Sequence, residues 1–402
     1  MKIALFTETY LPVINGVVTH VKSLKEGLEA LGHKVLIVTA DSTVKKHETE
    51  DNVMYCPAVR LKKIYNYDVA SPISIERLRH IRKFMPDIIH IHNEFGIGMS
   101  GIIIAKTLKI PLVYTLHTMY DEYVYYVANK HLCKFVTGVY HKYSKALASA
   151  AGALTGPSKK VEEFFWKCGV KKPVNVIPNP VEIDIFNPAN FPPKIRREYR
   201  EKFGYKDDEA IIAFCGRLGK EKNVSWLLRE WANHVKPNDK LKLLIIGDGP
   251  FYNQHESEIK TLGISHSVTL AGKVEHEKLP PYYTACDAYI TASLSDTNSI
   301  SMLEAMAMEL PVLHIRDELN TGQVVDGVNG YNFNNGVEMY EHLKKIRDLP
   351  KDKAAEFGAS ARNSVLNANC ANMAKSILSI YESVIKAHSF KKRRGGSGRL
   401  DK

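Results

Sequence analysis

Two carboxylates, Asp296 and Glu304, lie eight positions apart, on either side of the start of a predicted helix over residues 300–309. The loop carboxylate can accept hydrogen bonds from sugar hydroxyls, while Glu304, about one turn into the helix, can reach a ribose. The backbone amides of residues 298–301 at the helix start can hold an anion. The pattern suits a nucleotide-sugar, although two acidic residues at a helix start also simply complement the helix dipole.

Glycine-rich turns and two cations point to the same ligand. Arg217 and Lys222 follow a predicted strand and a glycine, and together they can neutralise a diphosphate without a metal, although each taken singly is more often a surface residue. Gly16 opens a predicted helix where a phosphate can approach the backbone. Gly247 lies in another turn at a strand end, and the backbone at Val274 is placed to pair with a base.

Histidines and aromatic residues also end predicted strands in the first half of the chain. His117 follows one strand and is expected to point out of its carboxyl end. His90 and His92 end the neighbouring strand with the spacing of metal ligands, but no third ligand is apparent, so a structural role is favoured. Tyr120 and Tyr123 belong to an aromatic stretch that either binds an apolar acceptor or is part of the core. The six cysteines form no CxxC pair, which argues against a zinc or disulfide framework.

These residues need a scaffold of alternating strands and helices. Helical patterns, for example over 16–31 and 75–84, separate apolar strand-like runs along the whole chain, which is the signature of βαβ units with parallel sheets. The predicted strands are 3–7, 34–39, 87–92, 112–116 and 153–155, then 210–215, 242–246, 268–270, 288–291 and 311–314. The fold class is therefore α/β, with two Rossmann-like, doubly wound domains and an active site expected in the cleft between them.

A chain of 402 residues is long enough for two domains. We predict an N-terminal domain over 1–185 and a C-terminal, nucleotide-binding domain over 186–369, with a helix over about 370–388 packing back on the first domain. Residues 389–402 are predicted to be a flexible basic tail. No apolar run reaches the roughly 20 residues that a spanning helix needs, and the N-terminus has no signal-peptide pattern, so we expect a cytoplasmic protein.

Basic charge is concentrated in the first half of the chain. Residues 1–190 carry 24 Lys and Arg against 17 Asp and Glu, a net +7 of the formal +11. Predicted helices there interleave apolar residues with basic ones, which are Arg77, Arg79, Arg82, Lys83, Lys130, Lys134, Lys142 and Lys145. Such helices either lie on an anionic membrane surface or are ordinary amphipathic helices packed on the sheet.

Together these motifs resemble the retaining glycosyltransferases with the GT-B fold, over about residues 1–385. The resemblance rests on the element from Asp296 to Glu304, on Gly216-Arg217-Leu218 with Lys222, and on Gly247-Asp248-Gly249-Pro250. Glu8-Thr9-Tyr10-Leu11-Pro12 with Asn15-Gly16-Val17, and His117-Thr118-Met119-Tyr120, resemble more narrowly the bacterial glucosyltransferases that act on diacylglycerol. That resemblance implies transfer of an α-glucosyl group from UDP-glucose to a lipid at the inner face of the cell membrane.

The resemblance also implies a role for each residue. Glu304 binds the donor ribose, the diphosphate contacts Arg217, Lys222 and the Gly16 amide, and His117 lies beside the sugar. Further donor contacts come from Gly247, Val274, Asp296, Asn298, Ser299 and Ile300, and acceptor contacts from Asn15, Tyr120 and Tyr123. The family retains anomeric configuration without a metal cofactor, and the leaving diphosphate takes the acceptor proton.

The chain departs from the family pattern at a few positions. Asp296 stands where the family usually has Glu, and Ser299 and Glu309 stand where it usually has Gly. Ser299 lies beside the predicted sugar-binding amides, so the donor sugar stays open. Other acceptors also stay open: a polysaccharide, a teichoic acid precursor or a phosphatidylinositol-type lipid. A non-catalytic scaffold that binds nucleotide-sugar or membrane is the alternative of another class, and no nucleic-acid partner is expected.

Overall fold

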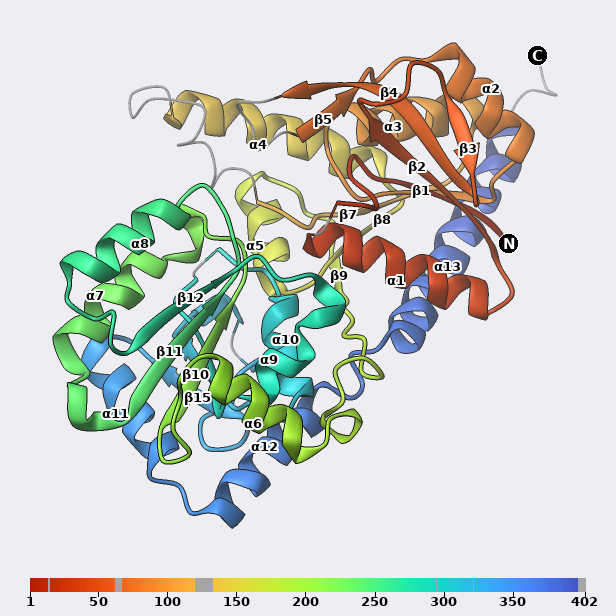
Figure 1. The fold of residues 1–402 in the computed structure, drawn as a ribbon. Helices are drawn as coiled ribbons and strands as arrows, with labels where there is room; N and C mark the ends of the chain where they lie inside the picture. Colours follow the sequence, from red (N-terminus) through yellow and green to blue (C-terminus); the bar gives the residue numbers. More distant parts are fainter. Residues whose placement is uncertain (14, 62–66, 120–132, 294, 321, 397–402) are drawn as a thin grey trace. The chain divides into compact units, whose positions relative to one another are not determined.

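The computed structural model describes residues 1–13, 15–61, 67–119, 133–293, 295–320 and 322–396, with the backbone alone for 391–396. It consists of two compact units (Figure 1). Unit 1 is Met1–Pro180 with Cys370–Lys402, and unit 2 is Val181–Asn369. The first boundary falls five residues before the predicted one at 185, because the Val181 amide already donates a hydrogen bond to the carbonyl of Ala368, within unit 2.

Unit 1 is built on a mainly parallel sheet with the strand order β3-β4-β2-β1-β6-β7-β8-β9, in which β3 and β5 pair with β4 in the antiparallel sense. The hairpin-like strands β3, β4 and β5 were not predicted from the sequence. The elements of unit 1 are β1 (Lys2–Phe6), α1 (Gly16–Ala30), β2 (Lys34–Asp41), β3 (Glu48–Glu50), β4 (Val53–Leu61), β5 (Tyr67–Ala70), α2 (Ile75–Phe84), β6 (Ile88–Ile91), α3 (Gly96–Leu108), β7 (Leu112–Thr115), α4 (Cys133–Ala150), β8 (Ala153–Gly156), α5 (Lys159–Lys167), β9 (Val174–Val176) and α13 (Cys370–Gly396).

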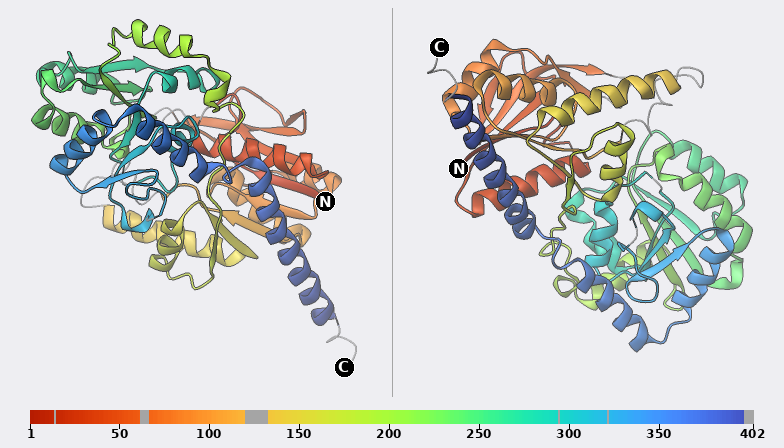
Figure 2. Two further views of the ribbon diagram at one scale, coloured as in Figure 1. Left: turned by 90° about the horizontal axis from the view of Figure 1, so that it is seen from below. Right: turned by 180° about the vertical axis from the view of Figure 1, so that it is seen from behind.

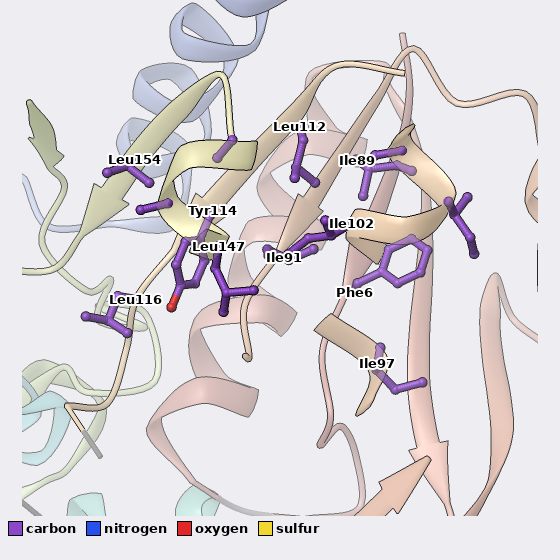
Figure 3. Packing of buried hydrophobic residues seen from close by; sticks show 14 of the residues in the cluster. Phe6, Ile89, Ile91, Ile97, Ile102, Leu112, Tyr114, Leu116, Leu147 and Leu154 are labelled. Carbon is purple, nitrogen blue, oxygen red and sulfur yellow. The ribbon is translucent and has the colours of Figure 1, made fainter. Parts of the chain in front are cut away.

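Helices cover both faces of this sheet. On one face, side chains of β1, β6 and β7 such as Phe6, Ile91 and Tyr114 pack with Ile102 of α3 and Leu147 of α4 (Figure 3). The strands are buried along nearly their whole length, which is why they read as continuous apolar runs and not as alternating patterns.

On the other face, the C-terminal helix α13 packs along α1 (Figures 1 and 2). Gly27 of α1 permits this close approach, since a Cβ there would lie 2.7 Å from the Cβ of Ala374 and 2.7 Å from the carbonyl oxygen of Cys370. The sequence predicted a flexible tail from residue 389. That prediction was wrong for residues 389–396, because α13 continues to Gly396. Lys and Arg are good helix formers, and the first glycine pair after them is Gly395 and Gly396.

Unit 2 has a smaller, parallel sheet with the order β12-β11-β10-β13-β14-β15. Its α-helices and strands are α6 (Pro193–Lys202), β10 (Ala210–Cys215), α7 (Val224–His234), β11 (Leu241–Ile246), α8 (Tyr252–Thr261), β12 (Val268–Gly272), α9 (Pro280–Thr284), β13 (Ala288–Thr291), α10 (Ile300–Ala307), β14 (Val312–Ile315), β15 (Gly330–Phe333), α11 (Gly336–Arg347) and α12 (Lys351–Val365). Short 3₁₀ turns at η3 (Lys220–Lys222) and η5 (His276–Lys278) follow β10 and β12.

Each sheet continues the βαβ pattern that the sequence predicted, and the carboxyl ends of parallel strands meet at one edge. Helix α10 ends at Ala307, two residues before the predicted end, and Glu309 has a left-handed backbone with a φ of 62°. Glycine adopts that conformation without steric cost, whereas a residue with a side chain pays a steric penalty there. Among the described residues, no helix combines the length and the apolar character needed to cross a bilayer.

Glu94 provides a test of this packing through the pH dependence of stability. Its carboxyl group is buried beside the Tyr114 hydroxyl, which donates to it at 2.8 Å, and burial outweighs the hydrogen bonds and raises the pKa to about 8. Between the ordinary pKa near 4.5 and about 8, the folded protein holds a proton that the unfolded chain releases, so this group lowers stability as pH rises.

We therefore expect Glu94→Gln to gain stability relative to wild type as pH rises from 5 to 9. Urea unfolding midpoints of both proteins across that range measure the difference. A difference that stays constant with pH would contradict a carboxyl group that is protonated in the folded state. Glu48→Gln, which replaces an exposed carboxylate of β3, serves as the matched control.

Candidate functional site

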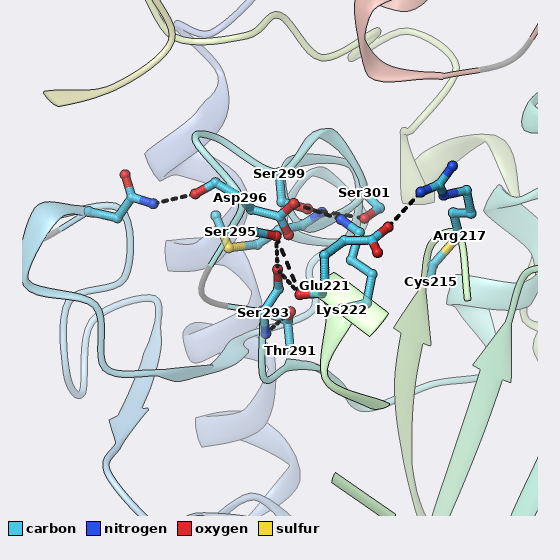
Figure 4. A network of polar contacts seen from close by, with 12 residues as sticks. Cys215, Arg217, Glu221, Lys222, Thr291, Ser293, Ser295, Asp296, Ser299 and Ser301 are labelled. Carbon is cyan, nitrogen blue, oxygen red and sulfur yellow. Dashed lines mark hydrogen bonds and ion pairs between the residues drawn. The ribbon is translucent and has the colours of Figure 1, made fainter. Parts of the chain in front are cut away.

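In unit 2 the polar residues gather on loops that follow β10 and β13 and lead into α10 (Figure 4). Lys222, at the end of η3, donates from Nζ to Asp296 Oδ1 at 2.7 Å. Both side chains are mostly buried. The cation predicted to bind a diphosphate and the carboxylate predicted to bind a sugar are thus joined directly.

The ion pair determines the charge of Asp296. Burial alone raises the pKa of this carboxyl group, but the Lys222 ammonium, its hydrogen bond and a hydrogen bond from Ser293 together lower the pKa below the ordinary value. Asp296 is therefore an anion at neutral pH, able to accept hydrogen bonds from hydroxyl groups.

Arg217 lies in the same loop and pairs with Glu221, from Nη2 to Oε1 at 2.8 Å. The Glu221 carboxylate is buried, whereas the Arg217 side chain is 40% exposed and keeps part of its guanidinium at the surface. The Ser293 and Ser295 hydroxyls donate to the Glu221 carbonyl oxygen at 3.4 and 3.3 Å, which ties this loop to the one before α10.

Gly247 is required by its surroundings. It follows β11 with a φ of 145°, and a Cβ there would lie 1.9 Å from the carbonyl oxygen of Gly216. The two glycine turns therefore lie against each other at the ends of neighbouring strands, closer than a side chain at position 247 would permit.

The start of α10 is fixed by side-chain hydrogen bonds. Ser299 is the N-cap, and its Oγ accepts from the Met302 amide at 3.4 Å. Ile300 is the first helical residue, and Asn298 Nδ2 donates to Gln323 Oε1 at 3.1 Å. These contacts hold the amides of the predicted anion site in a defined loop.

Glu304 has a partner that the sequence did not reveal. His276 Nε2 lies 2.7 Å from Glu304 Oε1, and His276 Nδ1 lies 3.5 Å from Glu182 Oε2. Glu304 is buried on α10, so an imidazole held between two carboxylates fixes its orientation. Only the position of His276, two residues after Val274, could have indicated it, and Val274 itself is half-buried against apolar neighbours.

Three of the predicted site residues, Asn15, Gly16 and His117, lie in unit 1. Asn15 is the N-cap of α1, accepting from the Val18 amide at 2.9 Å, and Gly16 is the first helical residue. His117 follows β7 and is half-buried. Tyr120 and Tyr123, the remaining candidate acceptor residues, lie outside the described residues.

His117 belongs to a cluster of four histidines in unit 1. His92 Nδ1 lies 3.0 Å from His117 Nε2, and the His20 ring packs against His117 at 4.5 Å between centroids. His90 instead hydrogen-bonds to the Tyr381 and Thr115 hydroxyls. Burial lowers the pKa of His20 to about 4 and the pKa values of His90, His92 and His117 well below the ordinary value, so these imidazoles are neutral.

The comparison with protein families covers both units. Residues 14–185 match the model described as Glycosyltransferase Family 4, and residues 195–364 match that of the group 1 glycosyl transferases. The chain is 31% identical to an α-monoglucosyldiacylglycerol synthase of Acholeplasma laidlawii over 358 residues, which are 87% of this chain and 89% of that protein. It is 33% identical to a protein of the same name from Streptococcus pneumoniae, over 78% of this chain and 70% of that protein.

Solved structures share the two-unit architecture. A glycosyltransferase from Rickettsia africae aligns with a TM-score of 0.74 and 18% identity, over 96% of this chain and 99% of that one. Anabaena HepE, solved in complex with UDP-glucose, aligns with a TM-score of 0.74 and 17% identity, over 95% and 100%. These likenesses establish the GT-B fold.

The ion pair of unit 2 can be tested with a double-mutant cycle. Lys222→Met leaves a mostly buried carboxylate without its ammonium and is expected to destabilise unit 2 by about 1–3 kcal/mol. Asp296→Asn in the same chain should recover part of that loss, giving a coupling energy of about 1 kcal/mol or more. Urea unfolding monitored by tryptophan fluorescence measures each variant.

Lys220→Met is the matched control, because Lys220 lies in the same 3₁₀ turn with an exposed side chain. It should change stability by about 0.5 kcal/mol or less. Additive effects of the two substitutions at 222 and 296 would show that the pair contributes nothing to folding.

Proposed function

The chain belongs to the group 1 glycosyltransferases, and we propose that it transfers a glucosyl group from UDP-glucose to a diacylglycerol-type membrane lipid, forming an α-glycolipid. The observation that carries this proposal is the identity of 31–33% to two α-monoglucosyldiacylglycerol synthases over most of the chain. A UDP-glucose complex of a protein with the same fold supports the donor.

Unit 2 supplies the groups that a nucleotide-sugar donor needs. Glu304 accepts hydrogen bonds from the ribose hydroxyls, and Asp296 accepts them from the glucose. Arg217 and Lys222 neutralise the diphosphate, assisted by the amide of Gly16 in unit 1. The backbone at Gly247 and Val274 contacts the nucleotide, and the amides of residues 298–300 hold the sugar end of the donor.

The proposed reaction needs no protein nucleophile. The bond between the glucose C1 and the diphosphate oxygen breaks, a bond from C1 to the acceptor hydroxyl oxygen forms on the same face, and the leaving diphosphate takes the hydroxyl proton. Lys222 and Arg217 stabilise the charge that develops on the diphosphate, which replaces the role of a metal. His117, a neutral imidazole, steadies the positive charge on the sugar with a lone pair and does not act as an acid.

The lipid acceptor requires the enzyme to work at a membrane surface, and α4 has the composition for it. Phe135 and Val139, 71% and 52% exposed, lie one turn apart on a helix that also exposes Lys134, Lys142 and Lys145. Apolar side chains beside lysines favour insertion into the interface of an anionic bilayer.

Helix α2 also exposes basic side chains, which are Arg79, Arg82 and Lys83. Arg77 of the same helix is buried, and its guanidinium donates to the Ser71 carbonyl and to Cys56 Sγ.

Arg77 is therefore not part of the proposed membrane surface, contrary to the sequence-based expectation. The remaining residue of that expectation, Lys130, lies outside the described residues. We propose a peripheral association with the inner face of the cell membrane through α2 and α4.

Transfer to lipid is the direct test. Radiolabelled UDP-glucose, incubated with the full-length protein and liposomes of diacylglycerol and phosphatidylglycerol, should yield a labelled product in the lipid extract. His117→Ala should lower the rate by about 100-fold, the scale for loss of one transition-state contact. Exposed His266→Ala is the matched control and should keep the wild-type rate.

The same assay separates the rival functions. Label that appears on phosphatidylinositol or on a soluble glycan, and not on diacylglycerol, would replace the acceptor. Transfer or donor hydrolysis that disappears in Glu304→Ala would exclude a non-catalytic scaffold, whereas UDP-glucose binding by the wild-type protein with neither activity would favour one.

Membrane binding has its own prediction. A triple variant with serine at Lys134, Lys142 and Lys145 should bind anionic liposomes at least tenfold more weakly, since each lysine near the surface contributes about 1 kcal/mol. Binding of wild type should fall with added salt. Co-sedimentation measures both effects.

Serine at Lys240, Lys260 and Lys353, three exposed lysines of unit 2, gives a control with the same change of charge. Equal losses in the two triple variants would mean that net charge, and not α4, governs the binding.

A further inference from the structure

Three histidines of unit 1 converge from separate parts of the chain. His20 lies on α1, His92 directly follows β6, and His117 lies two residues after β7. Their ligand atoms all lie within 4.8 Å of one another, and His92 Nδ1 and His117 Nε2 are 3.0 Å apart. Three nitrogens bound to one tetrahedral Zn²⁺ at about 2.0–2.1 Å are separated by about 3.3 Å, so small side-chain rotations suffice to close the site.

The tautomer of His20 leaves a nitrogen lone pair within the cluster. Its Nδ1 lies 3.0 Å from Asn179 Oδ1, an oxygen that only accepts, so Nδ1 carries the proton. The other nitrogen, Nε2, is then an acceptor, and it is buried with no hydrogen-bond partner. A buried acceptor without a partner costs free energy that a bound cation would recover.

His92 also has a buried ring nitrogen without a hydrogen-bond partner. One of its nitrogens faces His117, while its Nε2 is buried without a partner. The cluster thus offers three imidazole nitrogens to one cation.

The surroundings of His20 also match a metal ligand. Metal-binding histidines usually donate a hydrogen bond from their second ring nitrogen to an oxygen that fixes the ring, and the Asn179 amide oxygen accepts such a bond from His20. His117 is half-buried, whereas His20 and His92 are buried. The acidic residues Glu8 and Glu94 are engaged elsewhere, with backbone amides and Tyr114, so the ligand set is nitrogen alone.

We propose that His20, His92 and His117 form a binding site for one Zn²⁺, or a similar divalent cation that prefers imidazole ligands. Three histidines leave a fourth coordination position for water. Mg²⁺ and Ca²⁺ prefer oxygen ligands and are not expected to bind. The site would regulate and not support transfer: where the proposed function holds, a cation on His117 withdraws that imidazole from the sugar and inhibits the enzyme.

Direct metal binding is the test, independent of activity. Full-length protein stripped of metal is titrated with Zn²⁺ against a chromogenic chelator, and with Co²⁺ followed by its visible absorption. We expect one equivalent bound per chain, with a tetrahedral Co²⁺ spectrum. His20→Ala and His92→Ala should each weaken binding at least 100-fold, and exposed His80→Ala should leave it unchanged.

Asn179→Ala guards against variants that fail to fold, because it keeps all three ligands and removes only the oxygen that orients His20. It should weaken Zn²⁺ binding about 10–100-fold, with an unchanged circular dichroism spectrum. Absence of stoichiometric binding in wild type would overturn the proposal, as would equal affinity in wild type and the His20 and His92 variants.

Inhibition provides a second readout that rests on the proposed function. Zn²⁺ should inhibit transfer reversibly by EDTA, and Asn179→Ala should need a higher concentration for the same inhibition. Zn²⁺ binding without any transferase activity would leave the metal site standing and reject the proposed reaction. Binding without inhibition would reject the regulatory role alone.

Discussion

The ion pair between Lys222 and Asp296 is the contact on which the arrangement of the unit 2 site depends. It joins the loop after β10 to the loop before α10, so the cation and the carboxylate are positioned by each other as well as by the sheet. Without the ammonium, burial would raise the pKa of Asp296 and favour its protonated form. The pair therefore joins the two loops and keeps the carboxylate charged at the same time.

Glu304, the second carboxylate of the motif, is also oriented by a side-chain partner. This buried carboxylate faces an imidazole, His276, which is itself held by Glu182. His276 can share a proton with either carboxylate, so a hydrogen bond from an imidazole orients the Glu304 oxygen beside it. Asp296 and Glu304 are therefore oriented by different side chains, a lysine and a histidine.

The sequence predicted the elements well, because buried parallel strands read as apolar runs and their ends are marked by glycines and polar residues, as at Gly216 and Gly247. It did not predict which side chains meet. His20, His92 and His117 are separated by 72 and 25 positions, and only the strand order β1-β6-β7 brings them together. The partner of Glu304 was missed for the same reason, since a loop histidine carries no periodic signal. The antiparallel strands β3 and β5 were too short and too polar to predict.

Burial in unit 1 has a chemical consequence for the histidines. A cationic imidazole beside an oxocarbenium-like transition state would repel it, whereas a neutral one offers a lone pair. The pKa of His117 is lowered by burial and by the neighbouring His20 and His90, so the cluster itself maintains the neutral form. A neutral lone pair that can steady a positive sugar is equally a ligand for a metal cation. The feature that suits His117 to transfer would therefore also expose the enzyme to inhibition by Zn²⁺.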